Sequence, residues 1–209
     1  MQVIFSIIIF FSAILHLIGK YYKKPVFNYL FKPITTILII ILAFLLPDSV
    51  SIIYKSFIIV GLFFSLLGDI FLMLPKDKFI HGLISFFIAH VLFIIAIISD
   101  FGPYFDWQYL IPILLYLIII LKIILPHTGK IKLPVIFYTI IISFFLWQAA
   151  GRAYYLADNS SLLAFLGASA FIISDSVLAY NKFVKSFKLA EIIIMLTYWG
   201  ALYLLTLSL

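Results

Sequence analysis

Long apolar runs separated by short polar segments dominate the pattern of the chain. Several runs exceed the roughly 18 residues that mark a membrane-spanning helix. Their residues are apolar all round, whereas the strands of a transmembrane barrel would alternate apolar and polar positions. The pattern therefore predicts an all-α bundle that crosses the bilayer about eight times. The expected helices cover residues 2–18, 30–46, 52–74, 79–99, 107–125, 131–155, 160–180 and 188–208.

The composition supports one membrane domain. Of the 209 residues, 66% are hydrophobic and only 11% are charged, whereas a soluble domain carries about 25% charged residues. So few charges cannot cover a water-facing surface, so we expect residues 1–209 to form a single transmembrane helical domain. The chain contains no cysteine, which excludes disulfides, a thiol nucleophile and a thiolate metal site.

The distribution of lysines predicts how the chain is oriented in the membrane. The formal net charge of +6 does not indicate nucleic-acid binding, because all lysines except Lys55 lie in or beside every second loop. By the positive-inside rule these loops are cytoplasmic and both termini lie outside, as expected of a multi-pass protein of the cell membrane. The lysines of these loops are Lys20, Lys23, Lys24, Lys32, Lys76, Lys78, Lys122, Lys130, Lys132, Lys182, Lys185 and Lys188, and the opposite loops carry Asp48, Asp100, Asp106 and Asp158.

A short motif occurs twice. Residues 61–72 and 167–178 both fit Gly-x7-Asp-x2-Leu, which pairs Gly61 with Gly167 and Asp69 with Asp175. The two copies lie four spans apart, and an even offset gives two halves the same orientation in the membrane. We therefore predict two parallel four-helix repeats, over residues 1–103 and 104–209.

Two carboxylates inside apolar spans are the main candidates for chemistry. Asp69 lies in the third span, and Asp175 lies at a similar depth in the seventh. A charged side chain at the centre of the bilayer costs at least ~2.5–3.5 kcal/mol, so such residues usually face the bundle interior and serve a function. Two neighbouring carboxyl groups do not both ionise easily, which provides one acid and one base. The alternative is a structural polar network with Lys32 or Ser174.

The remaining polar residues of the spans have weaker signals. His90, near the middle of the fourth span, fits either a hydrogen-bonded packing residue or a functional one. A metal site made by Asp69, His90 and Asp175 is not expected, because no His-x3-His or Glu-x2-His pair lies on one helix face. Tyr138 and Tyr198 lie inside spans and can donate hydrogen bonds. We interpret His81 and Glu191 as solvated interface residues, His16 and His127 as incidental, and Arg152 as an anchor at the outer face.

Several short segments, in order along nearly the whole chain, resemble the YhhN-like family of multi-spanning membrane proteins, which is the lysoplasmalogenase family. They are Gly68-Asp69-x-x-Leu72, Phe79-x-x-Gly82, Phe86-Phe87-Ile88-Ala89-His90, Ser174-Asp175-Ser176 and Thr197-Tyr198, together with Lys32-Pro33 and Tyr138. One departure is that the family often has Gln shortly after the Thr-Tyr pair, where this chain has Trp199-Gly200-Ala201-Leu202.

This resemblance implies hydrolysis of the vinyl ether bond of a lysoplasmalogen, a lysophospholipid substrate, to a fatty aldehyde and a glycerophospho-ethanolamine or -choline, with no cofactor. On this hypothesis Asp69 and Asp175 are the acid and the base, in either order, and His90 orients a carboxyl group or the water. Lys32, Tyr138 and Tyr198 then bind the headgroup end of the substrate. The alkenyl chain enters between helices from the bilayer.

Three other functions fit parts of the pattern. Parallel repeats and intramembrane carboxylates also occur in proton-coupled transporters. A lipid-binding scaffold without catalysis and a hydrolase of another lysolipid fit the same residues.

Overall fold

The computed structural model describes residues 2–22, 24–47, 50–74 and 78–209. Eight α-helices follow one another along these described residues. They are α1 (Gln2–Tyr21), α2 (Pro25–Leu45), α3 (Ile52–Met73), α4 (Phe79–Phe101), α5 (Leu110–Ile124), α6 (Lys132–Leu156), α7 (Asn159–Ala179) and α8 (Ala190–Leu207). Two short 3₁₀ turns, η1 (Leu125–His127) and η2 (Gly129–Ile131), join α5 to α6, and one π turn, η3 (Tyr180–Val184), extends α7.

The predicted all-α membrane fold is confirmed. Within the described residues there is no strand, and eight helices are long and apolar enough to cross a membrane. The largest difference from the predicted spans is the start of α2, which begins at Pro25 rather than at residue 30. Proline is favoured in the first turn of a helix, because the N–H that it lacks has no partner there. Of the predicted loop charges, Lys23, Asp48 and Lys76 lie outside the described residues.

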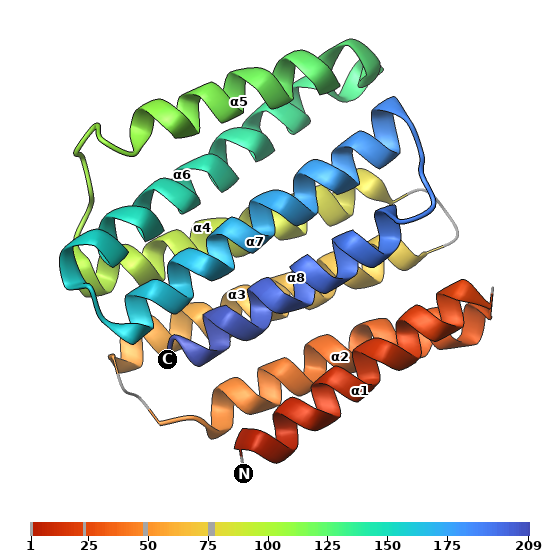
Figure 1. Cartoon of the computed structure of the whole chain (residues 1–209), viewed down its shortest axis with the longest axis horizontal. Helices are drawn as coiled ribbons and strands as arrows, with labels where there is room; N and C mark the ends of the chain where they lie inside the picture. Colours follow the sequence, from red (N-terminus) through yellow and green to blue (C-terminus); the bar gives the residue numbers. More distant parts are fainter. Residues whose placement is uncertain (1, 23, 48–49, 75–77) are drawn as a thin grey trace.

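The helices run antiparallel to their neighbours in sequence, and α1 begins at the end of the bundle where α8 ends (Figure 1). We call this the terminal end and the opposite end, where the α1–α2, α3–α4, α5–α6 and α7–α8 connections lie, the lysine-rich end. The α3–α4 and α7–α8 pairs form the centre, α1 and α2 pack on one side, and α6 packs on the other. Helix α5 is peripheral and packs mainly on α6, so it buries only Ile113 and Ile124.

The glycines of the repeated motif lie at close helix crossings. A Cβ atom added to Gly61 of α3 would lie 2.3 Å from the ring of Phe93 on α4, and one added to Gly167 of α7 would lie 3.1 Å from the carbonyl oxygen of Ala201 on α8. Small residues at such positions let membrane helices approach closely. Close packing thus explains both glycines, while the division of the chain into two parallel repeats stays a prediction.

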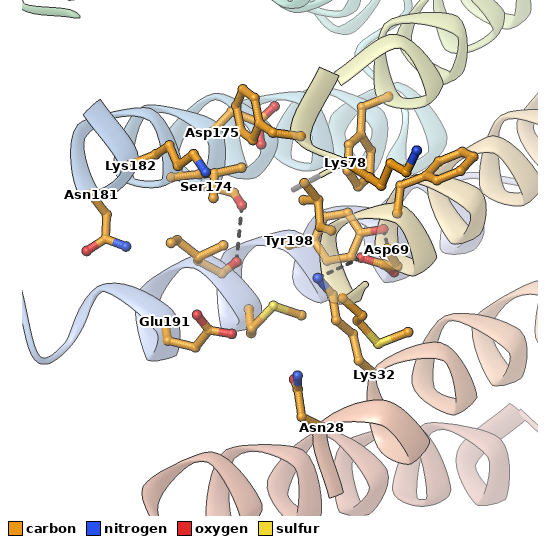
Figure 2. Close-up of a pocket in the computed structure, with 18 of the residues that line it drawn as sticks. Asn28, Lys32, Asp69, Lys78, Ser174, Asp175, Asn181, Lys182, Glu191 and Tyr198 are labelled. Carbon is orange, nitrogen blue, oxygen red and sulfur yellow. Dashed lines mark hydrogen bonds and ion pairs between the residues drawn. The ribbon is translucent and has the colours of Figure 1, made fainter. Parts of the chain in front are cut away.

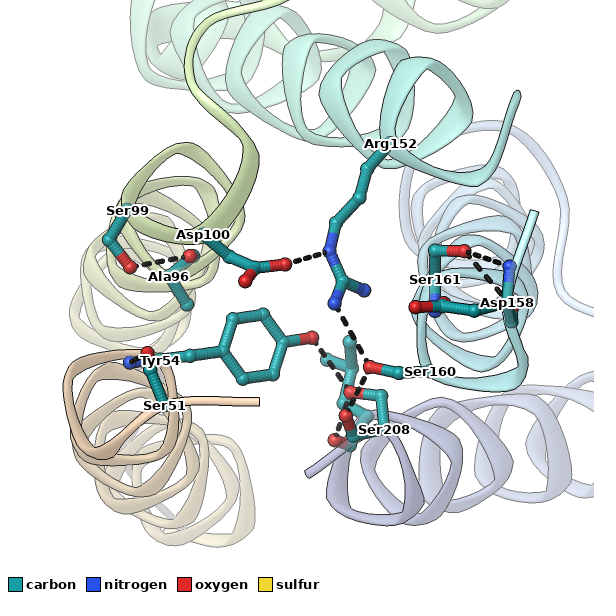
Figure 3. Close-up of polar contacts among 11 residues, drawn as sticks. Ser51, Tyr54, Ala96, Ser99, Asp100, Arg152, Asp158, Ser160, Ser161 and Ser208 are labelled. Atoms are coloured by element: carbon teal, nitrogen blue, oxygen red, sulfur yellow. Dashed lines mark hydrogen bonds and ion pairs between the residues drawn. The ribbon is translucent and has the colours of Figure 1, made fainter. Parts of the chain in front are cut away.

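A buried polar network closes the terminal end (Figure 3). Arg152 of α6, which we interpreted as an anchor at the outer face, lies at this end and is only 1% exposed. Its Nε donates to Asp100 Oδ2 of α4 at 2.7 Å, and its Nη2 donates to the hydroxyl of Ser160 of α7 at 3.0 Å. The guanidinium carbon also lies 4.9 Å from the ring centroid of Tyr54 of α3. One cation therefore joins four helices.

Adding a methyl group at Gly61 should destabilise the protein. The ring of Phe93 cannot move aside easily, because it is fully buried and packed against His90, Phe145 and Phe171. We expect Gly61→Ala to lower the free energy of unfolding by about 1–3 kcal/mol, as overpacking does. Gly200→Ala is the matched control, because nothing lies within 4 Å of its added Cβ. Unfolding in mixed detergent micelles measures both variants, and equal stabilities would contradict the predicted close crossing.

Removing the cation of the network should also destabilise the protein. Arg152→Met leaves Asp100, whose side chain is 18% exposed, without its partner. Breaking such a buried pair costs about 3 kcal/mol, and neutralising the second partner removes the unpaired charge. We therefore expect the double variant Arg152→Met, Asp100→Asn to be more stable than Arg152→Met alone. Exposed Lys185→Met serves as the control in the same unfolding assay, and a single variant as stable as this control would refute the role of the network.

Candidate active site

A cavity of about 220 Å³ lies at the lysine-rich end, walled by α2, α3, α4, α7 and α8 and by the end of α1 (Figure 2). A water molecule takes up about 30 Å³ in the liquid, so the cavity has room for several waters or for a small polar group. We call it the polar cavity, since most of the predicted site residues line it. Its polar wall consists of Lys20, Asn28, Lys32, Asp69, Lys78, Ser174, Asp175, Asn181, Lys182, Glu191 and Tyr198.

Asp69 is held by side chains from two other helices. Its side chain is 1% exposed, and Lys32 Nζ of α2 lies 3.4 Å from Oδ1. The hydroxyls of Thr36 of α2 and Tyr198 of α8 donate to Oδ2 at 2.8 and 2.9 Å. Lys32 and Thr36 both reach the carboxyl group because residues four apart lie on the same face of a helix. A cation and two neutral donors thus surround this carboxyl group.

Asp175 has different surroundings. It lies on α7, is partly exposed to the polar cavity, and accepts a hydrogen bond from the hydroxyl of Tyr138 of α6. No lysine or arginine among the described residues forms an ion pair with it, in contrast to Asp69. The two carboxyl groups do not bond to each other, and each faces the cavity from its own helix (Figure 2).

Asp175 also borders an apolar pocket. This pocket of about 40 Å³ lies between α4, α5, α6 and α7, and Asp175, Phe86 and Leu178 are among the residues that it shares with the polar cavity. Leu83 and Tyr138 join it in turn to a surface groove between α4 and α6. The lining of this groove is otherwise apolar and consists of Ile84, Phe87, Leu133, Pro134 and Phe137. The polar cavity therefore adjoins the apolar pocket, and the apolar pocket adjoins the groove. Asp175 lies at the boundary between the polar cavity and the apolar pocket.

His90 does not line the polar cavity or the apolar pocket. Its Nδ1 lies 2.8 Å from the carbonyl oxygen of Phe86, while its Nε2 is buried without a hydrogen-bond partner. Its ring lies edge-on to Tyr138, with 5.6 Å between centroids. The structure thus places His90 behind Tyr138, away from both carboxyl groups, and its catalytic role stays a prediction. No group of three or more His, Asp and Glu side chains suited to a metal ion occurs in the described part of the chain.

Two contributors were missed from the sequence. Thr36 carries no sequence signal, because a threonine in an apolar helix usually bonds to its own backbone. Its hydroxyl also accepts a hydrogen bond at 3.3 Å from Trp199 Nε1, and Trp199 packs edge-on against His16, with 5.1 Å between ring centroids. His16 is fully buried, and Glu191 lines the polar cavity with its side chain 33% exposed. The sequence pattern did not indicate either position.

The eight apolar helices and the carboxyl groups around a cavity at one end define a multi-pass integral membrane protein with a candidate site inside the bundle. The chain belongs to the YhhN family, whose model matches residues 27–209. The "Uncharacterized membrane protein YhhN" of Escherichia coli O6:H1 is 27% identical over 189 residues, which cover 90% of each chain.

Two mammalian relatives have names that state an activity. The "Lysoplasmalogenase TMEM86B" of Homo sapiens is 35% identical over 150 residues, which cover 69% of this chain and 59% of the relative. The "Lysoplasmalogenase TMEM86A" of Bos taurus is 32% identical over 157 residues, which cover 72% of this chain and 64% of the relative. No solved structure matches the chain.

Proposed function

We propose that this protein is a membrane hydrolase that cleaves the vinyl ether bond of lysoplasmalogens. The observation that carries the proposal is the place of Asp175, where the polar cavity meets the apolar pocket. In such a lipid the vinyl ether bond joins the polar glycerophospho headgroup to the apolar chain. A lipid with its headgroup in the polar cavity, the first carbons of its chain in the pocket and the rest in the groove therefore brings this bond beside Asp175. Membership of the family and the names of the mammalian relatives support the same reaction.

We assign the general acid to Asp175. Cleavage begins when a proton is delivered to the outer carbon of the vinyl group, which leaves an oxocarbenium ion at the carbon bound to oxygen. Apolar surroundings favour the protonated form of a carboxyl group, and Asp175 borders the apolar pocket and pairs with no lysine or arginine among the described residues. The Tyr138 hydroxyl, which donates to Asp175, fixes its orientation and stabilises the carboxylate that forms once the proton has left.

We assign the general base to Asp69. A nearby cation and donated hydrogen bonds favour the ionised form of a carboxyl group, and Asp69 has Lys32 at 3.4 Å and the hydroxyls of Thr36 and Tyr198. A carboxylate on the polar side of the bond can take a proton from the attacking water. The logic is that of glycoside hydrolysis, in which paired carboxyl groups serve an oxocarbenium-like centre.

The proton transfers balance over one turnover. Asp175 gives its proton to carbon, and Asp69 takes one from the water that adds to the cation to form a hemiacetal. In the collapse of the hemiacetal, Asp69 returns its proton to the glycerol oxygen as the carbon–oxygen bond breaks. Asp175 recovers a proton from the hemiacetal hydroxyl, which becomes the aldehyde. The products are a fatty aldehyde and a glycerophosphodiester, and both side chains return to their starting states.

Aldehyde release from a 1-alkenyl lysophospholipid by the detergent-purified protein tests the reaction. Loss of a general acid or base slows catalysis by about 10²–10⁴-fold, so Asp69→Asn and Asp175→Asn should each lower kcat by at least about a hundredfold. Asp158→Asn is the control, because Asp158 caps α7 outside the cavity through a hydrogen bond from Ser161, and asparagine caps a helix equally well.

Three results would contradict this proposal. Full activity in both folded variants would remove the carboxyl groups from the mechanism. Cleavage of an ester analogue but not of the vinyl ether would identify a hydrolase of another lysolipid. No release from the folded wild type, together with substrate flux into sealed vesicles, would favour a transporter.

A bulky side chain at Leu83 should impair binding of long-chain substrates. Leu83 lines both the apolar pocket and the groove, so Leu83→Trp fills the proposed path of the chain. Each buried CH₂ contributes about 0.8 kcal/mol, so displacing two of them weakens binding by about tenfold. We expect KM to rise by about that factor for a long-chain substrate and to change little for a short-chain one. Leu162→Trp, at a lipid-exposed position of α7, is the control, and an equal effect on both chain lengths would refute the path.

A further inference from the structure

An ion pair at the rim of the polar cavity is not used by the proposed reaction. Glu191 lies in the first turn of α8 and lines the cavity. Its Oε1 is 3.2 Å from the ammonium nitrogen of Lys20 of α1, and the side chains are 33% and 47% exposed. The buried ring of His16 lies behind the pair, with Nε2 4.0 Å from the same oxygen. The pair thus faces both the cavity and the surrounding water.

We propose that Glu191 is the binding site for the ammonium group of a zwitterionic lysolipid headgroup, and that the ammonium of Lys20 occupies this place when no lipid is bound. The inference rests on the proposed function in one respect, namely that the lipid in the cavity is the substrate. The chemical class of the ligand is a lysophospholipid with a cationic amine, primary or quaternary, beside its phosphate.

The other carboxyl groups of the described cavity wall are not available to an ammonium group. Asp69 is already compensated by Lys32 at 3.4 Å and is 1% exposed. Asp175 stands at the apolar boundary and bonds to Tyr138. Glu191 lines the cavity with 33% of its side chain exposed, so an ammonium group can reach it (Figure 2). Its partner Lys20 is a long and half-exposed side chain, so a ligand amine exchanges one ammonium group for another.

The phosphate of such a headgroup finds cations in the same cavity. Lys78 and Lys182 line it together with Glu191, and Lys182 is held over the ring of Phe79, with its Nζ 5.1 Å from the ring centroid. In Figure 2 the side chain of Lys182 lies on the wall opposite Glu191. Lysine ammonium groups bind phosphate as point charges. A wall with cations on one side and a carboxylate on the other is complementary to a zwitterion rather than to an anion.

In this arrangement helix α1 contributes two residues to the Glu191 site. All of α1 precedes residues 27–209, the part that matches the family model. It contributes His16 and Lys20. The two ring nitrogens of His16 have no hydrogen-bond partner, and its ring packs on Trp199. His16 is a positioning residue that backs Glu191, and Lys20 is the residue that the ligand displaces.

Competitive binding read by native mass spectrometry tests the site without turnover. The probes are two saturated 1-O-alkyl lysophospholipids of equal chain length, which contain no vinyl group to cleave: one carries phosphocholine, the other a bare phosphate. We expect Glu191→Gln to weaken binding of the phosphocholine lipid about threefold or more, a size limited by solvent screening at the rim. Binding of the bare phosphate lipid should stay unchanged or improve.

The matched variant Lys20→Gln should have the opposite effect. It frees Glu191 from its internal partner, so binding of the phosphocholine lipid should strengthen. Weaker binding in Lys20→Gln would identify Lys20 as a phosphate ligand and would overturn the proposal. An equal change for both lipids in Glu191→Gln, or no change for either in a variant with the wild-type melting temperature, would overturn it as well. Because these probes are not hydrolysed, failure of the vinyl ether reaction would leave this result unaffected.

Discussion

The cost of placing a carboxyl group among apolar helices governs the lysine-rich end of this bundle. A buried charge is tolerated only when it is paired and hydrogen-bonded. Asp69 satisfies this rule with Lys32, Thr36 and Tyr198, which come from α2 and α8. One buried side chain thereby fixes how three helices meet, and the polar cavity forms beside it. The residues that stabilise the packing here are the same ones that shape the candidate site.

The two ends of the bundle accommodate buried charged side chains in different ways. At the terminal end, Arg152 is enclosed by Asp100, Ser160 and the ring of Tyr54. At the lysine-rich end, polar side chains surround a cavity of about 220 Å³ instead of each other. A packed end provides rigidity and an open end provides space for a ligand, so the arrangement favours a site reached from one end and from the lipid-facing groove.

The sequence was sufficient to predict the number of helices and the main residues of the cavity. Charges inside long apolar runs are costly, so Asp69 and Asp175 were informative on their own. Lys32 was singled out as a binding residue only by the family resemblance. Thr36 could not be predicted, since a threonine in an apolar helix carries no such signal. The burial of Arg152 and His16 could not be predicted, because burial depends on which helices face each other, and periodicity does not reveal this in runs that are apolar all round. His90 illustrates the same limit, because its depth along α4 did not show that it lies behind Tyr138.

The repeated Gly-x7-Asp motif explains how one bundle can contain two carboxyl groups at matching positions in different surroundings. In both copies the glycine allows a close crossing, and the aspartate two turns later faces the polar cavity. The neighbours, however, differ: a lysine accompanies Asp69, whereas a tyrosine and an apolar pocket accompany Asp175. Neighbouring groups decide which protonation state of a carboxyl group is favoured. Asp69 and Asp175 therefore differ in their chemistry although they occupy matching positions in the motif. An acid and a base can therefore arise from one motif when only the surrounding helices diverge.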